Sequence, residues 1–503
     1  MKAKNIIIYT TAILFFMITG CKKILEQPVL GQYQSGDFFT SDANATLAVN
    51  AAYNPLTFTD ASSNAIWVLG DVASDDAIKG GNPGDQADFQ SIDEFNIIPS
   101  NSAVEGVWKR YYDGIFKCNV VIDGLSDANK AVSDAVKKSV VGQAQFLRAY
   151  YYFNLTVAYG DIPMHLKVET PEELQSPALP QAQIYAQIEK DCQAAAAALP
   201  ASWPAADLGR ATKGAAMALL AKTYLFEKKW DLAATTAKAV DALGVYSLLP
   251  IFADNFRAAT KNNAESVFSV QHASGLVPFQ GNTLNQWFAP RSQNGYGFFY
   301  PTQSLVDNFE KSTGGVVDPR LDYTVGRAGH PWFDTSFDPT WTTTGFLSKK
   351  HIQPLTEIPT ATKGDGNLNY PAIRFAEVLL IEAEALNEKG DGAGALVPLN
   401  RVRKRARESY VYDKTLPDYA GGVVPAGLLP DVTVTDQAQL RDIIRKERRS
   451  ELALEFHRFF DVIRYGAAYA SDALKDQPNF NYSSNQFFPI PLSERQTNLK
   501  LGK

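Results

Sequence analysis

A stretch in the middle of the chain combines aromatic rings with planar hydrogen-bonding groups. Residues 285–341 carry the rings of Trp287, Phe288, Tyr296, Phe298, Phe299, Tyr300, Trp332, Phe333 and Trp341. Amide and guanidinium groups are interleaved with them, namely Asn285, Gln286, Arg291, Gln293 and Asn294. A sugar offers a C–H face on which a ring can stack and hydroxyls that amides and guanidinium groups can bind. The pattern predicts a carbohydrate site with Trp287, Arg291, Asn294, Tyr296 and Trp332 as ligand contacts.

The segments around these residues lack helical periodicity. Between about residues 249 and 370 Gly, Pro, Asn and Thr dominate, with one short strand expected at 266–272. Loops of that length inside a compact domain are usually functional. Residues 70–101 share the character and contain Asp75 and Asp76, which we add to the predicted ligand contacts. The alternative is that the aromatic side chains form a small core beneath the loops.

Motifs for catalysis are absent from the sequence. It contains no nucleophile elbow, P-loop, dinucleotide fingerprint or HExxH, and its five histidines are dispersed. The sequence therefore predicts no catalytic residue, no metal site and no cofactor. A glycosidase pair of carboxylates is set by the fold and not by sequence spacing, so an extracellular glycan hydrolase stays an alternative.

The N-terminus has the features of an exported protein. Lys2 and Lys4 precede an apolar run at 6–18, which is too short to span a bilayer and is typical of a signal peptide over residues 1–20. The run ends Ile-Thr-Gly-Cys, which resembles a bacterial lipobox whose Cys21 becomes acylated and anchors the chain to a membrane. The alternative is an ordinary cleavage site with an incidental cysteine.

Composition limits the partners. The 503 residues are 45% apolar and 20% charged, which are globular values, and the formal charge is −6. An acidic chain argues against nucleic acid and against binding anionic lipid by charge alone.

Cys118 and Cys192 fall within helical patterns, and we expect buried free thiols, although an oxidising compartment would permit a disulfide.

Most of the remaining chain shows helical spacing of apolar residues. We expect helices that begin at Ser41 and that cover 104–125, 131–159, 181–198, 213–227, 231–242, 373–389, 393–407 and 436–466. Their pairing resembles degenerate tetratricopeptide-type hairpins. The stretch 436–466 has no Gly or Pro before Gly466, so we expect one long amphipathic helix whose Arg and Glu side chains pair with neighbouring elements.

Three motifs carry a family resemblance. The run KERRSELALEFHRFFDVIRYG at 446–466 resembles the C-terminal signature of the SusD/RagB family, although Phe456 and His457 depart mildly from it. GQAQFLRAYYYFNLTVAYGDIPM at 142–164 resembles its internal motif, and FFPIPLSERQTNLKL at 487–501 resembles its usual ending. The segment 301–310 and Asp318-Pro319-Arg320 resemble a further landmark, which we expect to be structural.

The resemblance implies an all-α superhelix of tetratricopeptide-like hairpins. It implies one domain over 21–503, with a helical scaffold at about 40–248 and 371–466 and a loop-rich ligand region at about 249–370. It further implies a lipid-anchored protein on the outer face of the outer membrane that binds an oligosaccharide without catalysis and delivers it to a SusC-like TonB-dependent transporter. A peptide-binding member of the family and a purely structural lipoprotein are the alternatives.

Overall fold

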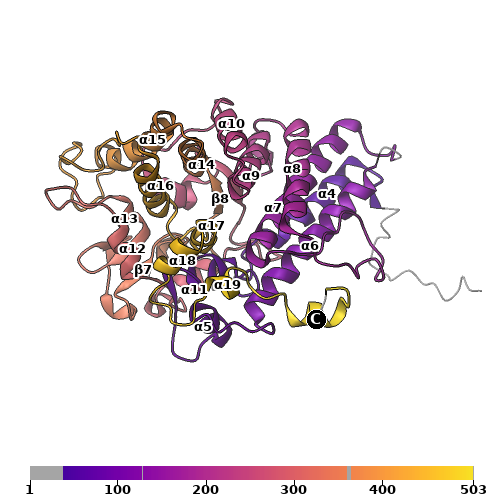
Figure 1. Ribbon diagram of the computed structural model, residues 1–503, viewed down its shortest axis with the longest axis horizontal. Coiled ribbons are helices and arrows are strands. Elements are labelled where there is room, and N and C mark those ends of the chain that lie inside the picture. The colour runs from indigo at the N-terminus through magenta and orange to yellow at the C-terminus, as the bar shows by residue number, and fades with distance from the viewer. Residues whose placement is uncertain (1–37, 127–128, 359–363, 502–503) are drawn as a thin grey trace, which may run out of the picture.

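The computed structural model describes residues 38–126, 129–358 and 364–501. Cys21 lies outside these ranges, so the predicted leader and anchor remain predictions. The fold is mostly helical, as the sequence predicts, and its long helices stand side by side across one edge of the molecule (Figure 1). Within the described ranges, no helix combines the length and the apolar character that a membrane crossing requires.

The first half of the chain forms consecutive antiparallel helices. They are α4 (Asp42–Tyr53), α6 (Ser102–Gly124), α7 (Asp134–Tyr159), α8 (Gln181–Ala198), α9 (Lys213–Phe226) and α10 (Trp230–Asp241). Ser41, Asn101 and Thr212 cap three of them by accepting hydrogen bonds from backbone N–H groups in the first turn. Each helix packs on its successor, as in a tetratricopeptide-like array.

The array continues after a long interruption. Helices α14 (Phe375–Glu388) and α15 (Gly392–Tyr412) form a hairpin, α10 packs against α14, and α16 (Gln437–Leu452) lies against both. Shorter helices complete the C-terminal part: α17 (Arg458–Arg464), α18 (Ala467–Ala473), α19 (Tyr482–Asn485) and α20 (Leu492–Thr497). Residues 241 and 375 thus bound a segment that leaves the array and returns to it.

Among its described residues, that segment contains short helices and seven short strands, which form three antiparallel pairs with one another and one pair with β1 of the N-terminal part. The helices are α11 (Leu284–Phe288), α12 (Gln303–Asn308) and α13 (Arg320–Thr324), and α5 (Ala87–Asp93) lies beside α11 (Figure 1). The pairs are β1 (Ala77–Gly80) with β3 (Phe298–Pro301), β2 (Ser266–Val270) with β8 (Tyr370–Arg374), β4 (Val325–Arg327) with β7 (Phe346–Ser348), and β5 (Pro331–Trp332) with β6 (Thr335–Ser336). The sequence predicts β2 only.

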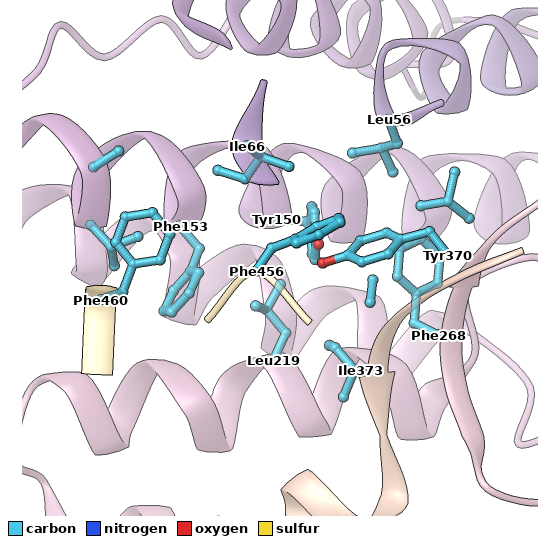
Figure 2. Packing of buried hydrophobic residues seen from close by; sticks show 14 of the residues in the cluster. Leu56, Ile66, Tyr150, Phe153, Leu219, Phe268, Tyr370, Ile373, Phe456 and Phe460 are labelled. Atoms are coloured by element: carbon cyan, nitrogen blue, oxygen red, sulfur yellow. The ribbon is translucent and has the colours of Figure 1, made fainter. Parts of the chain in front are cut away.

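A large apolar cluster joins the array to this segment. Figure 2 shows Phe456 beside Tyr370 of β8, with Tyr150 of α7 and Leu219 of α9 close by and Phe153 of α7 farther along the same cluster. The rings of Tyr370 and Phe456 stack with their centroids 5.0 Å apart. The loops therefore rest on the helical core.

The C-terminal stretch differs from the prediction. The expected helix over 436–466 is broken between α16 and α17, because Leu454 and Phe456 adopt positive φ. The carboxylate of Asp71, in the short π-helix Val68–Val72, accepts hydrogen bonds from the backbone N–H groups of Phe456 and Arg458 at 2.8 and 3.1 Å. The backbone of Phe456 also passes so close to Gly70 that a Cβ there would overlap it. The contact between Asp71 and residues 456–458 thus interrupts the helix that the apolar spacing predicts.

The charged face of α16 pairs with neighbouring elements, as predicted. Glu451 accepts hydrogen bonds from Arg374 at 2.9 Å and from Arg320 at 3.0 Å. Arg320 also donates to the carboxylate of Asp318 at 2.6 Å. These side chains are fully buried. The Asp318–Arg320 landmark is therefore structural, as expected.

Cys118 and Cys192 are buried and unpaired, which confirms the prediction of buried free thiols.

Candidate functional site

The predicted aromatic region meets an N-terminal loop through a strand pair. β1 and β3 place Gly80 opposite Phe298, and the backbone N–H of Gly81 donates to the carbonyl of Gly297. Gly80 and Gly81 both adopt positive φ, and a Cβ at either would overlap an aromatic ring of β3. The glycine pair lets residues 80–86 lie directly beside residues 291–298.

Residues 289–297 form a tightly closed loop. The N–H of Gly297 donates to the carbonyl of Ala289 at 3.0 Å, and the N–H of Tyr296 donates to the carbonyl of Gln286 at 2.7 Å. Gly295 leaves no room for a side chain against Ala289. These hydrogen bonds fix the position of Tyr296 before any ligand binds.

Trp287 lies beneath this loop and not on its surface. Its side chain is 8% exposed and packs against the rings of Trp67, Phe89 and Phe298 at centroid distances of 6.0, 5.8 and 5.0 Å. This corrects the prediction that Trp287 stacks on a ligand, because the side chain is buried among other rings. The neighbouring Tyr296 meets Trp287 edge to face at 5.5 Å and is 40% exposed.

The polar candidates of the same loop are at the surface. Arg291 and Asn294 are exposed, at the start and just after the end of the short 3-10 helix Arg291–Gln293. Arg291 donates to the carboxylate of Asp85 at 2.7 Å, and this pair joins the loop to residues 80–86. Tyr296, Arg291, Asn294 and Asp85 therefore form one exposed surface, which we call the Tyr296 surface.

Trp332 does not join that surface. Its side chain is 1% exposed, packs against Phe337 and Trp341, and lies where any side chain at Gly326 would overlap its ring. Its indole N–H donates to the Gln293 side-chain oxygen at 2.9 Å. The prediction of ligand contact by Trp332 is corrected as well, because the ring supports the loop from within.

Asp75 and Asp76 are also structural. Asp76 accepts from Arg449 at 2.7 Å and Asp75 accepts from Arg458 at 2.7 Å, and both carboxylates are buried. Burial acts to raise the pKa of Asp75, but Arg458 and Arg449 outweigh it and hold that pKa below its usual value. The predicted ligand contacts are corrected, because these carboxylates already neutralise arginines of the C-terminal segment.

Sequence reasoning missed two contributors to the Tyr296 surface. Asp85 is in a Gly-Pro turn that the sequence marks as a functional loop, yet nothing in its spacing points to Arg291. Trp67 supports Trp287 from a helical segment with no distinctive motif. Contacts between segments far apart in the sequence, including the β1–β3 pairing, bring these residues together.

Comparison with known proteins identifies relatives over most of the chain. Residues 264–501 match a family model described as the SusD family, and residues 40–225 match one described as "Starch-binding associating with outer membrane". The chain is 25% identical to the SusD-like protein P25 of Formosa agariphila, over 99% of this chain and 97% of that protein.

Solved structures agree in fold. A SusD-like carbohydrate binding protein from Bacteroides fragilis is 26% identical with a TM-score of 0.78, covering 92% of this chain and 100% of that one. A laminarin binding SusD-like protein is 28% identical with a TM-score of 0.76, covering 92% of this chain and 99% of that one. Together with the sequence motifs, these matches show that the chain belongs to the SusD family.

Proposed function

We propose that this protein captures an oligosaccharide at the cell surface and hands it to a SusC-like TonB-dependent transporter in the outer membrane. It binds without catalysis. Cys21 carries the lipid anchor, and the ligand lies on the Tyr296 surface with Arg291 and Asn294 as hydrogen-bonding partners.

The observation that carries the proposal is the setting of Tyr296. Its ring is exposed, while the loop hydrogen bonds and the buried Trp287 hold it in place. A fixed ring loses little conformational entropy when a sugar stacks on it. Asn294 and Arg291 stand within the same short loop and supply donors for hydroxyl groups.

The charge of this surface favours a neutral glycan. Arg291 is paired with Asp85, so its cationic charge is already balanced. Lys79 of β1 donates to the backbone carbonyl of Asp85 at 2.6 Å and so holds the turn at residues 80–85 in place. The surface therefore offers donors and acceptors without a net charge that would select uronic acids or sulfated sugars. The carbohydrate-binding and laminarin-binding relatives support the same class of ligand.

Delivery to a transporter and attachment to the outer membrane are supported by family membership and by the lipobox-like sequence before Cys21. In this arrangement the protein acts as a binding lid, and transport is the work of the partner. Co-purification of the full-length lipoprotein with a TonB-dependent transporter, after mild detergent extraction, tests this part.

The binding function is tested by calorimetric titration of the mature protein with laminarihexaose, maltohexaose and xylohexaose, followed by an assay for reducing ends. We expect saturable binding of at least one glycan and no release of reducing sugar. Binding followed by hydrolysis would show a glycan hydrolase instead. Binding of none of the three, together with saturable binding of a peptide library, would show a peptide-capturing protein.

A further inference from the structure

We infer that the protein has a second carbohydrate subsite, which takes a single neutral hexose unit in a cleft that shares no residue with the Tyr296 surface. The cleft has a volume of about 280 Å³ and lies between the end of α4, residues 206–210 and the end of β2. Its walls include Tyr53, Asn54, Leu208, Arg210 and Gln280. This inference does not rest on the function proposed for the Tyr296 surface.

A hydrogen-bonded network holds one wall of the cleft. The Tyr53 hydroxyl donates to the side-chain oxygen of Gln143 at 3.0 Å and accepts from the N–H of Ala211 at 2.9 Å. Arg210 donates to Asn50 at 2.9 Å and to the same Gln143 oxygen at 3.2 Å. Gln143 is buried, so the network is anchored in α7 and presents a fixed surface to a ligand.

The neighbouring part of the lining is fixed by backbone geometry. Gly209 has a φ of +95°, and a Cβ there would overlap the side chain of Gln271. The Gln271 amide group is itself held by Asn262 and by Asn369, at 2.9 Å in each case. The loop therefore lies against β2 at a distance that only glycine permits.

Three polar groups of the cleft are open to solvent, since Asn54 is exposed and Arg210 and Gln280 are partly exposed. In the described part of the chain, the side-chain amides of Asn54 and Gln280 and the Nη2 group of Arg210 make no hydrogen bond, whereas the Arg210 Nε is committed to Asp207 at 2.8 Å. Each amide offers both a donor and an acceptor. A ligand with several hydroxyl groups can satisfy this set, since a hydroxyl both donates and accepts.

The remaining lining decides the class of ligand. Among the described lining residues the charged pair is Asp207 and Arg210, and because they neutralise each other no net charge attracts an ionic ligand. Leu208, which is 49% exposed, and the buried Leu56 and Val270 supply the apolar part of the lining. A lining that combines apolar side chains with amides matches a pyranose ring, whose C–H face is apolar and whose rim is polar.

Ligand-observed NMR titrations with D-glucose, D-galactose and D-mannose test the subsite in the mature protein. The key variant is Asn54→Ala/Gln280→Ala, which removes the two free amides. Its matched control is Gln439→Ala, an exposed amide in the first turn of α16. Tyr296→Ala serves as the variant of the other surface. Thermal melts should agree between variants and wild type, since the removed amides make no hydrogen bonds in the described structure.

We expect one hexose to bind the wild type, Tyr296→Ala and Gln439→Ala equally, and the double variant about 5- to 100-fold more weakly, the loss from two hydrogen bonds. Hydrogen exchange with that hexose should show protection at residues 205–210 and 269–280. No binding of any of the three sugars overturns the inference, as does binding that is lost in Tyr296→Ala and retained in the double variant. Neither result changes the oligosaccharide titration of the Tyr296 surface, so the two proposals fail separately.

Discussion

The rings of Trp287 and Tyr296 meet edge to face at 5.5 Å with an interplanar angle of 86°, one buried and the other 40% exposed. The two rings of this pair have different roles in the candidate site. Trp287 belongs to the core beneath the loop, and Tyr296 is the ring that a sugar can reach. The first prediction follows from that division.

Trp287→Ala should lower the free energy of unfolding by about 3–5 kcal/mol, because the ring leaves a cavity among Trp67, Phe89 and Phe298. Chemical denaturation followed by circular dichroism measures the change. From the sequence alone the expectation is the reverse, a loss of ligand affinity with little loss of stability. An unchanged unfolding midpoint in this variant would return Trp287 to the ligand surface.

Arg449→Ala should destabilise the protein by about 3–5 kcal/mol, since it removes the hydrogen-bonded cation of the buried Asp76 carboxylate and leaves Arg458 at 3.9 Å. Arg495→Ala in α20 is the matched control, because Arg495 is exposed, and it should change stability by less than about 0.5 kcal/mol. Equal unfolding midpoints for the two variants would contradict the structural role of Asp75 and Asp76.

Acid should destabilise the fold through the carboxylates around α16. Burial acts to raise the pKa values of Glu377, Glu451 and Asp461, but the surrounding cations, such as Arg448 beside Asp461, outweigh it and hold all three well below their usual values. A depressed pKa in the folded state adds stability above the unfolded-state pKa of about 4, and that stability is lost as the pH falls further.

Denaturant titrations from about pH 7 down to about pH 3 should therefore show a steep fall in unfolding free energy below about pH 5. The variant Gln439→Ala, at an exposed amide that does not titrate in the first turn of α16, should keep the same pH profile as the wild type. Stability that stays flat down to about pH 3 would contradict the depressed pKa values.

Cys21→Ala should release the protein from the membrane fraction and abolish incorporation of radiolabelled fatty acid. Cys118→Ala is the control, because that thiol is buried and unpaired in α6 and should leave both readouts unchanged. Fatty acid incorporated into the Cys21→Ala protein would refute the lipobox assignment.

The sequence predicts the helical array well because each helix carries its own information. Apolar spacing and caps such as Ser41 and Thr212 are local, so α8 begins and ends at the expected residues. The break at 453–457 depends on Asp71, far away in the sequence, and periodicity cannot reveal it. The β1–β3 pair is invisible for the same reason.

The candidate site shows the same limit. Composition identifies the loop that contains Tyr296, Arg291 and Asn294, and these side chains are exposed together. It cannot separate exposed rings from buried ones, because burial of Trp332 depends on Gly326 and Trp341, which approach only after the strands pair. Ligand contact by the three exposed residues stays a prediction.

The most direct measurement is a calorimetric titration of Tyr296→Ala with the glycan that the wild type binds best. Tyr412→Ala is the matched control, because that tyrosine is 52% exposed at the end of α15, outside the Tyr296 surface. We predict an affinity loss of about 1–3 kcal/mol for Tyr296→Ala, about 5- to 100-fold, and no change for Tyr412→Ala. Wild-type affinity in both variants, with unchanged thermal melts, would contradict glycan capture on the Tyr296 surface.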